Sequence, residues 1–336
     1  MDEAAVYASD PASAPDTDFS PAGLRHLVPG NTGRLLDARR TPVAVVGVSP
    51  ERGSFVVRIE AFEDAGAEWE LGLHEIGRFQ FANDAAVASG AALSELERSL
   101  ARFDRELVIE CDPEARRDSL SRLAQQREMA RGWLDAHARD FELDVELSIE
   151  AREGDETLFR LVEEFTAELG LGELERSFSA AFVTNPRSGE LVKGHAIVLA
   201  ELGLCPYRGR VARDPELFAA DHSRERRAEH MLRRLAFTQA LWQRLLASRE
   251  LPLYRGAASE TQLSGERSGS FVSATFSRAV AQSHFEGGPS TRSAVLWRQP
   301  LPLDRLLMTF VETRAMNERY REAEAVLIGD PENSAF

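Results

Sequence analysis

Lysine and cysteine are nearly absent from this chain. Its 336 residues include one lysine, Lys193, and two cysteines, Cys111 and Cys205, far apart in sequence. Two cysteines provide neither a disulfide framework nor a zinc site, and their scarcity is typical of a reducing compartment. The seven histidines lack the close spacing of metal ligands on one helix. We therefore expect no metal. The arginine-for-lysine bias reflects base composition, so a single arginine says little about function.

Long apolar runs and an excess of positive charge are also missing. No stretch of about 18 apolar residues occurs, and the first residues lack the basic and apolar regions of a signal peptide. A net charge of −15 argues against a general surface for nucleic acid or anionic membrane. We expect a soluble protein that is cytoplasmic, or delivered by a route independent of a signal peptide, with no membrane partner.

The length predicts two or three folded units. Residues 1–22, rich in Ala, Pro, Ser and Asp, read as a disordered tail. Short Val-, Ile- and Phe-rich runs between Pro and Gly turns predict a small antiparallel β module over 23–86, for which an SH3-like barrel is our guess. Residues 87–154 read as a helical linker or scaffold. The chemistry is expected in 155–336.

Periodicity gives the elements of the middle of the chain. Apolar residues recur at three and four spacings over 91–110 and 119–138, which predicts two amphipathic helices. Residues 141–150, "FELDVELSIE", alternate strictly and predict a half-buried strand. Asp155 is placed to N-cap a helix through about Leu169.

A further helix is predicted by "HMLRRLAFTQALWQRLLASRE". It places Leu235, Trp242 and Leu246 on one face, with the arginines mostly on the other. The apolar stripe indicates core packing. Beyond it the pattern changes to short strands and loops.

The first motif there is "LPLYRGAAS". Arg255 lies at the exit of a predicted strand, and Gly256 beside it leaves the backbone bare for a ligand. The planar guanidinium suits bidentate binding of phosphate. A second Tyr-Arg-Gly occurs at Arg208 in "CPYRGRV", and by itself either arginine is more often a surface residue than a ligand contact.

Two more motifs follow. In "SGSFVSATFSRAVAQSHF", apolar and hydroxyl residues alternate from Phe271 to Thr275, which predicts a strand with Ser273 and Thr275 on one face. Ser277 is placed to cap the next helix. In "YREAEAVLIGD", preceded by a polar loop, Glu322 and Glu324 are two residues apart, so on a strand their carboxylates project side by side.

In this order, Arg, Ser-x-Thr and Glu-x-Glu resemble the mono-ADP-ribosyltransferase superfamily, in its Arg-Ser-Glu branch of bacterial toxin type. The resemblance covers about 155–336, most specifically "LYRG", "SFVSATFSRAVAQSHF" and "EAEAVLIG". It implies an α+β fold in which a split β-sheet core with N-terminal helices follows the small β module and the helical segment. It also implies NAD as substrate.

For NAD binding, the resemblance implies that Arg255, with Gly256 beside it, holds the phosphates. The second Tyr-Arg-Gly is set aside, because only the Arg255 copy is followed by the other two motifs at the family's spacing. Ser273 and Thr275 belong to the middle motif, in which the family usually has Ser-Thr-Ser and this chain has Ser-Ala-Thr. The family also stacks an aromatic ring on nicotinamide. The sequence does not place that ring, since Phe285 is near but its helical position predicts core packing.

For catalysis, the resemblance implies that Ser273 orients Glu324, which binds the nicotinamide ribose, and that Glu322 engages the acceptor. A carboxylate at the first position is associated in the family with arginine acceptors. We therefore expect a toxin or effector that transfers ADP-ribose from NAD to a protein arginine, with an immunity or antitoxin protein as a further partner. The alternatives are an NAD glycohydrolase and a non-catalytic NAD or ADP-ribose binding module; the acidic charge disfavours a nucleic-acid acceptor.

Overall fold

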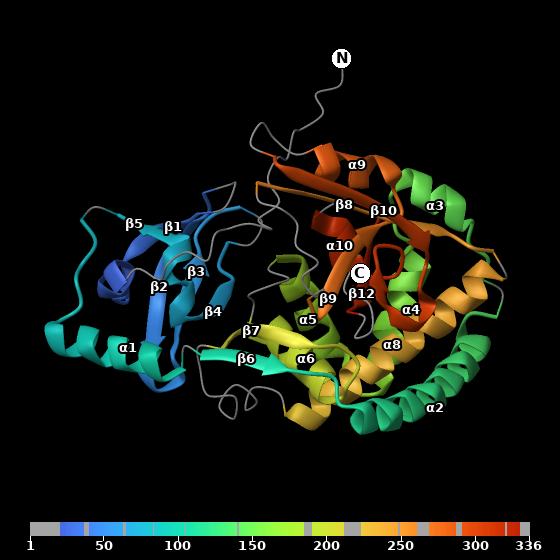
Figure 1. Cartoon of the computed structure of the whole chain (residues 1–336), viewed down its shortest axis with the longest axis horizontal. Coiled ribbons are helices and arrows are strands. Elements are labelled where there is room, and N and C mark those ends of the chain that lie inside the picture. The colour runs from blue at the N-terminus through green and yellow to red at the C-terminus, as the bar shows by residue number, and fades with distance from the viewer. Residues whose placement is uncertain are drawn as a thin grey trace, which may run out of the picture. The chain divides into compact units, whose positions relative to one another are not determined.

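The computed structural model describes residues 21–36, 40–62, 65–82, 84–103, 105–139, 141–184, 190–211, 223–247, 249–260, 269–286, 291–319 and 321–329. The expected disordered tail, 1–22, therefore lies almost wholly outside the described residues. The fold is mixed α+β (Figure 1). The described residues form two compact units: a larger one within 109–207 and 224–336, and a smaller one within 14–108 and 208–223.

The smaller unit is an antiparallel sheet of five strands in the order β4-β3-β2-β1-β5. Its elements are the strands β1 (Thr32–Leu35), β2 (Pro42–Ser49), β3 (Ser54–Ile59), β4 (Glu68–Gly72) and β5 (Phe79–Phe81), the 3-10 helices η2 (Pro21–His26), η3 (Pro50–Arg52) and η4 (Leu73–Arg78), and α1 (Gly90–Phe103). Phe55, Val57, Leu73 and Ile76 are buried in its core, which Leu96 of α1 joins. An antiparallel module is thus present; its SH3-like assignment stays a prediction.

The helix expected over 91–110 is shorter than the pattern predicted. α1 ends at Phe103, and β6 (Arg105–Ile109) follows and pairs with β7 (Tyr207–Val211). Within β6, Leu107 and Ile109 are half-buried while Glu106 and Val108 are exposed. That period of two is typical of a strand, and it overrides the weak helical continuation.

Helices form most of the first half of the larger unit. They are α2 (Pro113–His137), α3 (Val145–Ala151), α4 (Glu156–Glu168), α5 (Gly172–Thr184), α6 (Glu190–Glu201) and α8 (Arg224–Leu246). α2 lies along α8 (Figure 1). Asp155 caps α4 as predicted, because its carboxylate accepts from the amides of Thr157 at 2.8 Å and Leu158 at 3.2 Å.

A second antiparallel sheet of five strands follows, in the order β10-β8-β9-β12-β11. Its elements are β8 (Pro252–Ser259), β9 (Phe271–Thr275), β10 (Ser293–Pro300), β11 (Leu306–Thr309) and β12 (Glu324–Ile328), with α9 (Arg278–Glu286), η5 (Leu303–Arg305) and α10 (Arg314–Arg319) between them. β9 has the bounds that alternation predicted. All four residues of β11 are buried, so both faces of this strand are covered.

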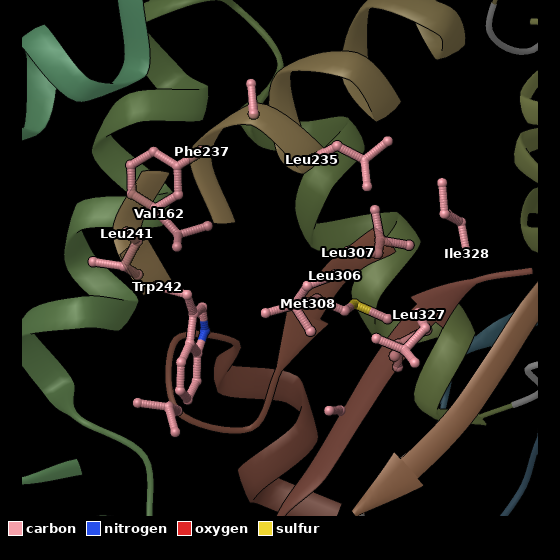
Figure 2. Packing of buried hydrophobic residues seen from close by; sticks show 14 of the residues in the cluster. Val162, Leu235, Phe237, Leu241, Trp242, Leu306, Leu307, Met308, Leu327 and Ile328 are labelled. Carbon is pink, nitrogen blue, oxygen red and sulfur yellow. The ribbon is translucent and has the colours of Figure 1, made fainter. Parts of the chain in front are cut away.

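One hydrophobic core joins the helices to this sheet. Figure 2 shows, within this core, Val162 of α4, three residues of α8 (Phe237, Leu241 and Trp242) and Leu306 of β11. The same core contains Leu123, Ala130 and Leu134 of α2. A boundary at residue 155 therefore divides a single core, since α2 packs with the elements beyond it.

The strand expected over 141–150 is wrong. The structure has α3 there, and Asp144 caps it by accepting from Leu147 N at 3.1 Å. Val145 is buried and Ile149 packs on the core. Because these two residues are four apart, they lie on the same face in a helix and also in a strand, so their burial fits both structures. The cap at Asp144 favours the helix.

Two further expectations differ from the structure. α8 does bury Leu235 and Trp242, but Arg234 is 1 % exposed and lies inside the unit rather than on the outer face. The segment before Glu322 is not a polar loop: Glu312 is buried, and α10 follows it. In both cases buried partners satisfy the charge, which periodicity cannot reveal.

Candidate active site

Strand β9 and helix α9 are joined by hydroxyl caps. Ser277 accepts from Val280 N at 3.4 Å, which supports the start of α9 as the sequence predicted. Thr275 accepts from Ser277 N at 3.0 Å and is itself buried. The end of β9 and the first turn of α9 are thus held together by the side chains of the second motif.

Gly256 is where α9 approaches β8. A Cβ atom on Gly256 would lie 1.7 Å from the carbonyl oxygen of Ala281 and 2.9 Å from Phe285 N. We expected the bare backbone of Gly256 to make room for a ligand. In the structure it makes room for α9 instead. Gly256 still lines the candidate pocket, and its close contact with α9 sets where that helix lies.

The two glutamates do not both lie on a strand. β12 begins at Glu324, and Ala323 before it has a left-handed φ of 49°. A non-glycine residue in this region is strained and persists only where its surroundings hold it. We expected Glu322 and Glu324 to project side by side because residues alternate along one strand. That expectation is wrong, since Glu322 lies before the strand begins.

Three successive carbonyl groups hold this strained segment in place. Glu322 O accepts from Thr275 Oγ1 at 2.5 Å, Ala323 O accepts from Phe276 N at 3.0 Å, and Glu324 O accepts from Phe310 N at 2.9 Å. The donors come from the end of β9 and from the turn after β11. Because the hydroxyl of Thr275 is used in this way, it positions the backbone of Glu322.

A pocket of about 50 Å³ opens among these elements. Its lining includes all six residues named from the sequence: Arg255, Gly256, Ser273, Thr275, Glu322 and Glu324. Tyr254, Ala274, Val280, Ala281 and His284 complete it. Strands β8, β9 and β12 and helix α9 therefore bring the three motifs to one place, although up to about seventy residues separate them along the chain.

Glu324 has a distinct electrostatic environment. Ser273 Oγ donates to its Oε1. Burial raises the pKa of the Glu324 carboxyl to about 7; the Ser273 hydrogen bond opposes this shift and the nearby Glu322 charge adds to it. This carboxylate therefore gains and loses its proton near neutral pH, as groups at functional sites often do.

His284 is a pocket residue that sequence reasoning missed. It lies on α9 four residues after Val280 and three after Ala281, which also line the pocket. The helical period was the signal that could have found it. Phe285, expected in the core, is 36 % exposed and does not line the pocket.

Arg208, the other Tyr-Arg-Gly arginine, is placed differently. It lies on β7 in the smaller unit, where its Nε is 3.4 Å from Glu106 Oε1 in an exposed ion pair. It does not line this pocket.

Neither a metal cluster nor a membrane span is found in the part of the chain that the structure describes. No group of three or more His, Cys, Asp and Glu side chains there could hold a metal ion. No described helix is long and apolar enough to cross a membrane. In comparisons with known proteins, no family model, no curated protein and no solved structure matches the chain.

Proposed function

We propose that the larger unit transfers ADP-ribose from NAD to a protein arginine and releases nicotinamide. The observation that carries the proposal is the single pocket that joins Arg255, Ser273, Glu322 and Glu324, with Glu324 hydrogen-bonded by Ser273. The order of the motifs is that of the transferase family which the sequence resembles, and an ADP-ribosyltransferase-like sheet core is part of the proposal.

The chemistry explains why a fixed carboxylate is needed. The bond between nicotinamide and ribose breaks, nicotinamide leaves with the electron pair, and positive charge builds on the sugar. An ionised, immobile Glu324 stabilises this charge more than it stabilises the neutral ribose of the ground state. The three hydrogen bonds on the backbone of 322–324 supply the immobility.

The other pocket residues have separate tasks. Arg255 pairs with the phosphates as a planar fork. Glu322 pairs with the guanidinium of the acceptor and takes its proton as nitrogen bonds to the sugar. Ser273, which also lines the pocket, orients Glu324 through its hydrogen bond.

The testing experiment measures nicotinamide released from NAD by the purified protein, with and without a small guanidine compound as acceptor. We expect release in both cases and transfer of labelled ADP-ribose to the guanidine. Protein carrying Glu324→Gln, purified in parallel, controls for contaminating activity. No release, even with added cell lysate, contradicts the proposal; release without a labelled acceptor indicates NAD hydrolysis, with water as acceptor.

The same assay over a pH series tests the role of Glu324. Ionised Glu324 is the active form, so kcat/KM should rise about tenfold per pH unit below pH 7 and level off above it. A profile that is flat between pH 5 and 8 contradicts an essential carboxylate with this pKa.

A further inference from the structure

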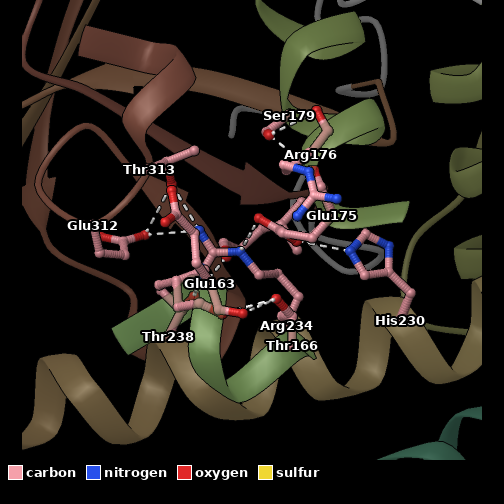
Figure 3. Close-up of polar contacts among 12 residues, drawn as sticks. Glu163, Thr166, Glu175, Arg176, Ser179, His230, Arg234, Thr238, Glu312 and Thr313 are labelled. Atoms are coloured by element: carbon pink, nitrogen blue, oxygen red, sulfur yellow. Dashed lines mark hydrogen bonds and ion pairs between the residues drawn. The ribbon is translucent and has the colours of Figure 1, made fainter. Parts of the chain in front are cut away.

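A group of charged side chains lies inside the larger unit. Figure 3 shows Arg234 of α8 between Glu175 of α5 and Glu312, which follows β11. Arg234 Nε is 3.1 Å from Glu175 Oε1, and its Nη2 is 3.2 Å from Glu312 Oε1. The exposed fractions of Arg234, Glu175 and Glu312 are 1 %, 4 % and 1 %. His230 Nε2 adds a contact of 2.7 Å to Glu175 Oε2.

Stability alone is a poor reason for such a group. Removing charges from water costs several kcal/mol per ion, and packed apolar residues of similar volume are often as stabilising as a buried ion pair. These charged side chains do, however, hold the elements that carry them in one fixed geometry.

Glu312 fixes the turn after β11. Its Oε1 accepts from Thr309 N at 2.6 Å, and its Oε2 accepts from Thr309 Oγ1 and from Trp242 Nε1 at 3.2 Å. The carboxylate thus closes the turn on itself and ties it to α8 through Trp242 and Arg234. Thr313 Oγ1 also accepts from Arg234 Nη2, at 2.7 Å.

This turn contacts the candidate active site directly. Phe310, inside the turn, donates its amide to Glu324 O at 2.9 Å, and Thr309 pairs with Ala325 in the β11–β12 ladder. The strained residue Ala323 lies just before this point. A shift of the turn therefore moves the main chain of Glu324.

We infer that Glu312 is a positioning residue, whose buried carboxylate fixes the turn at Thr309 and Phe310 and thereby the main chain of Glu324. Its effect on catalysis rests on the proposed function; its effect on the placement of Glu324 does not. Glu312 borders no part of the pocket.

The experiment compares Glu312→Gln with Glu175→Gln. Both replace a buried glutamate paired with Arg234, but only Glu312 touches the turn. Glu312→Gln should lower kcat for nicotinamide release by about tenfold or more with KM for NAD within about twofold, since small misplacement of a catalytic group is costly. Glu175→Gln should keep kcat within about twofold while lowering the melting temperature. Equal losses of kcat in both variants overturn the inference.

Trp242→Phe provides a gentler change if Glu312→Gln does not fold. It removes one of the two donors to Glu312 Oε2 and keeps a ring against Phe276, whose centroid is 5.3 Å from that of Trp242. We expect kcat to fall about threefold or more with unchanged KM. An unchanged kcat overturns the inference.

A readout independent of activity is the titration of the Glu324 carboxyl followed by carbon NMR, with its signal identified by comparison with Glu324→Gln. In Glu312→Gln the pKa of Glu324 should move from about 7 toward its usual range, and the same shift is expected in Trp242→Phe, a substitution that alters no charge. In Glu175→Gln the pKa of Glu324 should stay unchanged. Identical titrations in all variants overturn the positioning role. If the wild type releases no nicotinamide, the proposed function fails, and this titration still decides the inference.

Discussion

Gly256 on β8 and Ala281 on α9 are so close that no side chain fits between them: a Cβ on Gly256 would lie 1.7 Å from Ala281 O. The atom it would meet belongs to the backbone, so it cannot turn aside as a flexible side chain would. The packing of α9 on β8, which shapes one wall of the candidate pocket, therefore depends on this glycine.

Gly256→Ala should lower the free energy of unfolding by about 2 kcal/mol or more, because α9 must move off the sheet. Urea denaturation measures the change. Gly132→Ala is the matched control: Gly132 is exposed on α2 with nothing within 4 Å of an added Cβ. It should raise stability by about 0.5–1 kcal/mol. Equal effects of the two substitutions would show that the close approach is not real.

Arg255→Lys should weaken NAD binding about tenfold or more, because a point charge replaces a bidentate fork. Calorimetric titration measures the dissociation constant. Arg208→Lys, at the other Tyr-Arg-Gly, should be nearly silent, since Arg208 pairs with Glu106 in the smaller unit. The reverse result would mean that the wrong arginine has been assigned to NAD.

Much of the site was predictable because its signals are local. Alternation gave β9, and the hydroxyl of Ser277 and the carboxylate of Asp155 marked helix starts. Each of these depends on neighbours within four residues. The residues expected to meet in the site do line one pocket.

What the sequence could not give depends on distant contacts. Arg234 reads as a surface arginine until α5 and the turn after β11 provide its carboxylates. The left-handed Ala323 follows from donors on β9 and in that turn, not from its own side chain. Gly256 could be read as a ligand contact because nothing local shows that α9 returns to cover it.

The stability of the protein should depend on pH through Glu324. Its pKa in the folded state, about 7, is above the ordinary value of 4.5, so the unfolded chain releases this proton first. This carboxyl therefore lowers stability progressively as pH rises from about 4.5 to 7, and no further above that. The free energy of unfolding of Glu324→Gln minus that of the wild type should therefore be larger at pH 8 than at pH 5. The increase should be on the order of 1 kcal/mol, because partial exposure of the carboxyl reduces the effect. Urea denaturation at the two pH values measures this difference, and a difference of the opposite sign would contradict the pKa assignment.

The shortest active fragment should begin near residue 105 rather than 155. A fragment from 155 lacks α2, which contributes Leu123, Ala130 and Leu134 to the core. We expect the fragment 105–336 to be folded and to release nicotinamide, and the fragment 155–336 to aggregate. Circular dichroism and the nicotinamide assay distinguish them. A folded, active fragment from 155 would show that α2 is dispensable.

The most direct test of the central claim is to compare Glu324→Gln and Glu322→Gln for both nicotinamide release and transfer to a guanidine acceptor. If Glu324 stabilises the charge on ribose, Glu324→Gln should lower both activities by about a hundredfold or more. If Glu322 serves the acceptor, Glu322→Gln should abolish transfer and leave much of the slow hydrolysis, because water needs no guanidinium-binding carboxylate. Equal loss of both activities in the two variants would contradict separate tasks, and no loss in either would contradict the proposed active site.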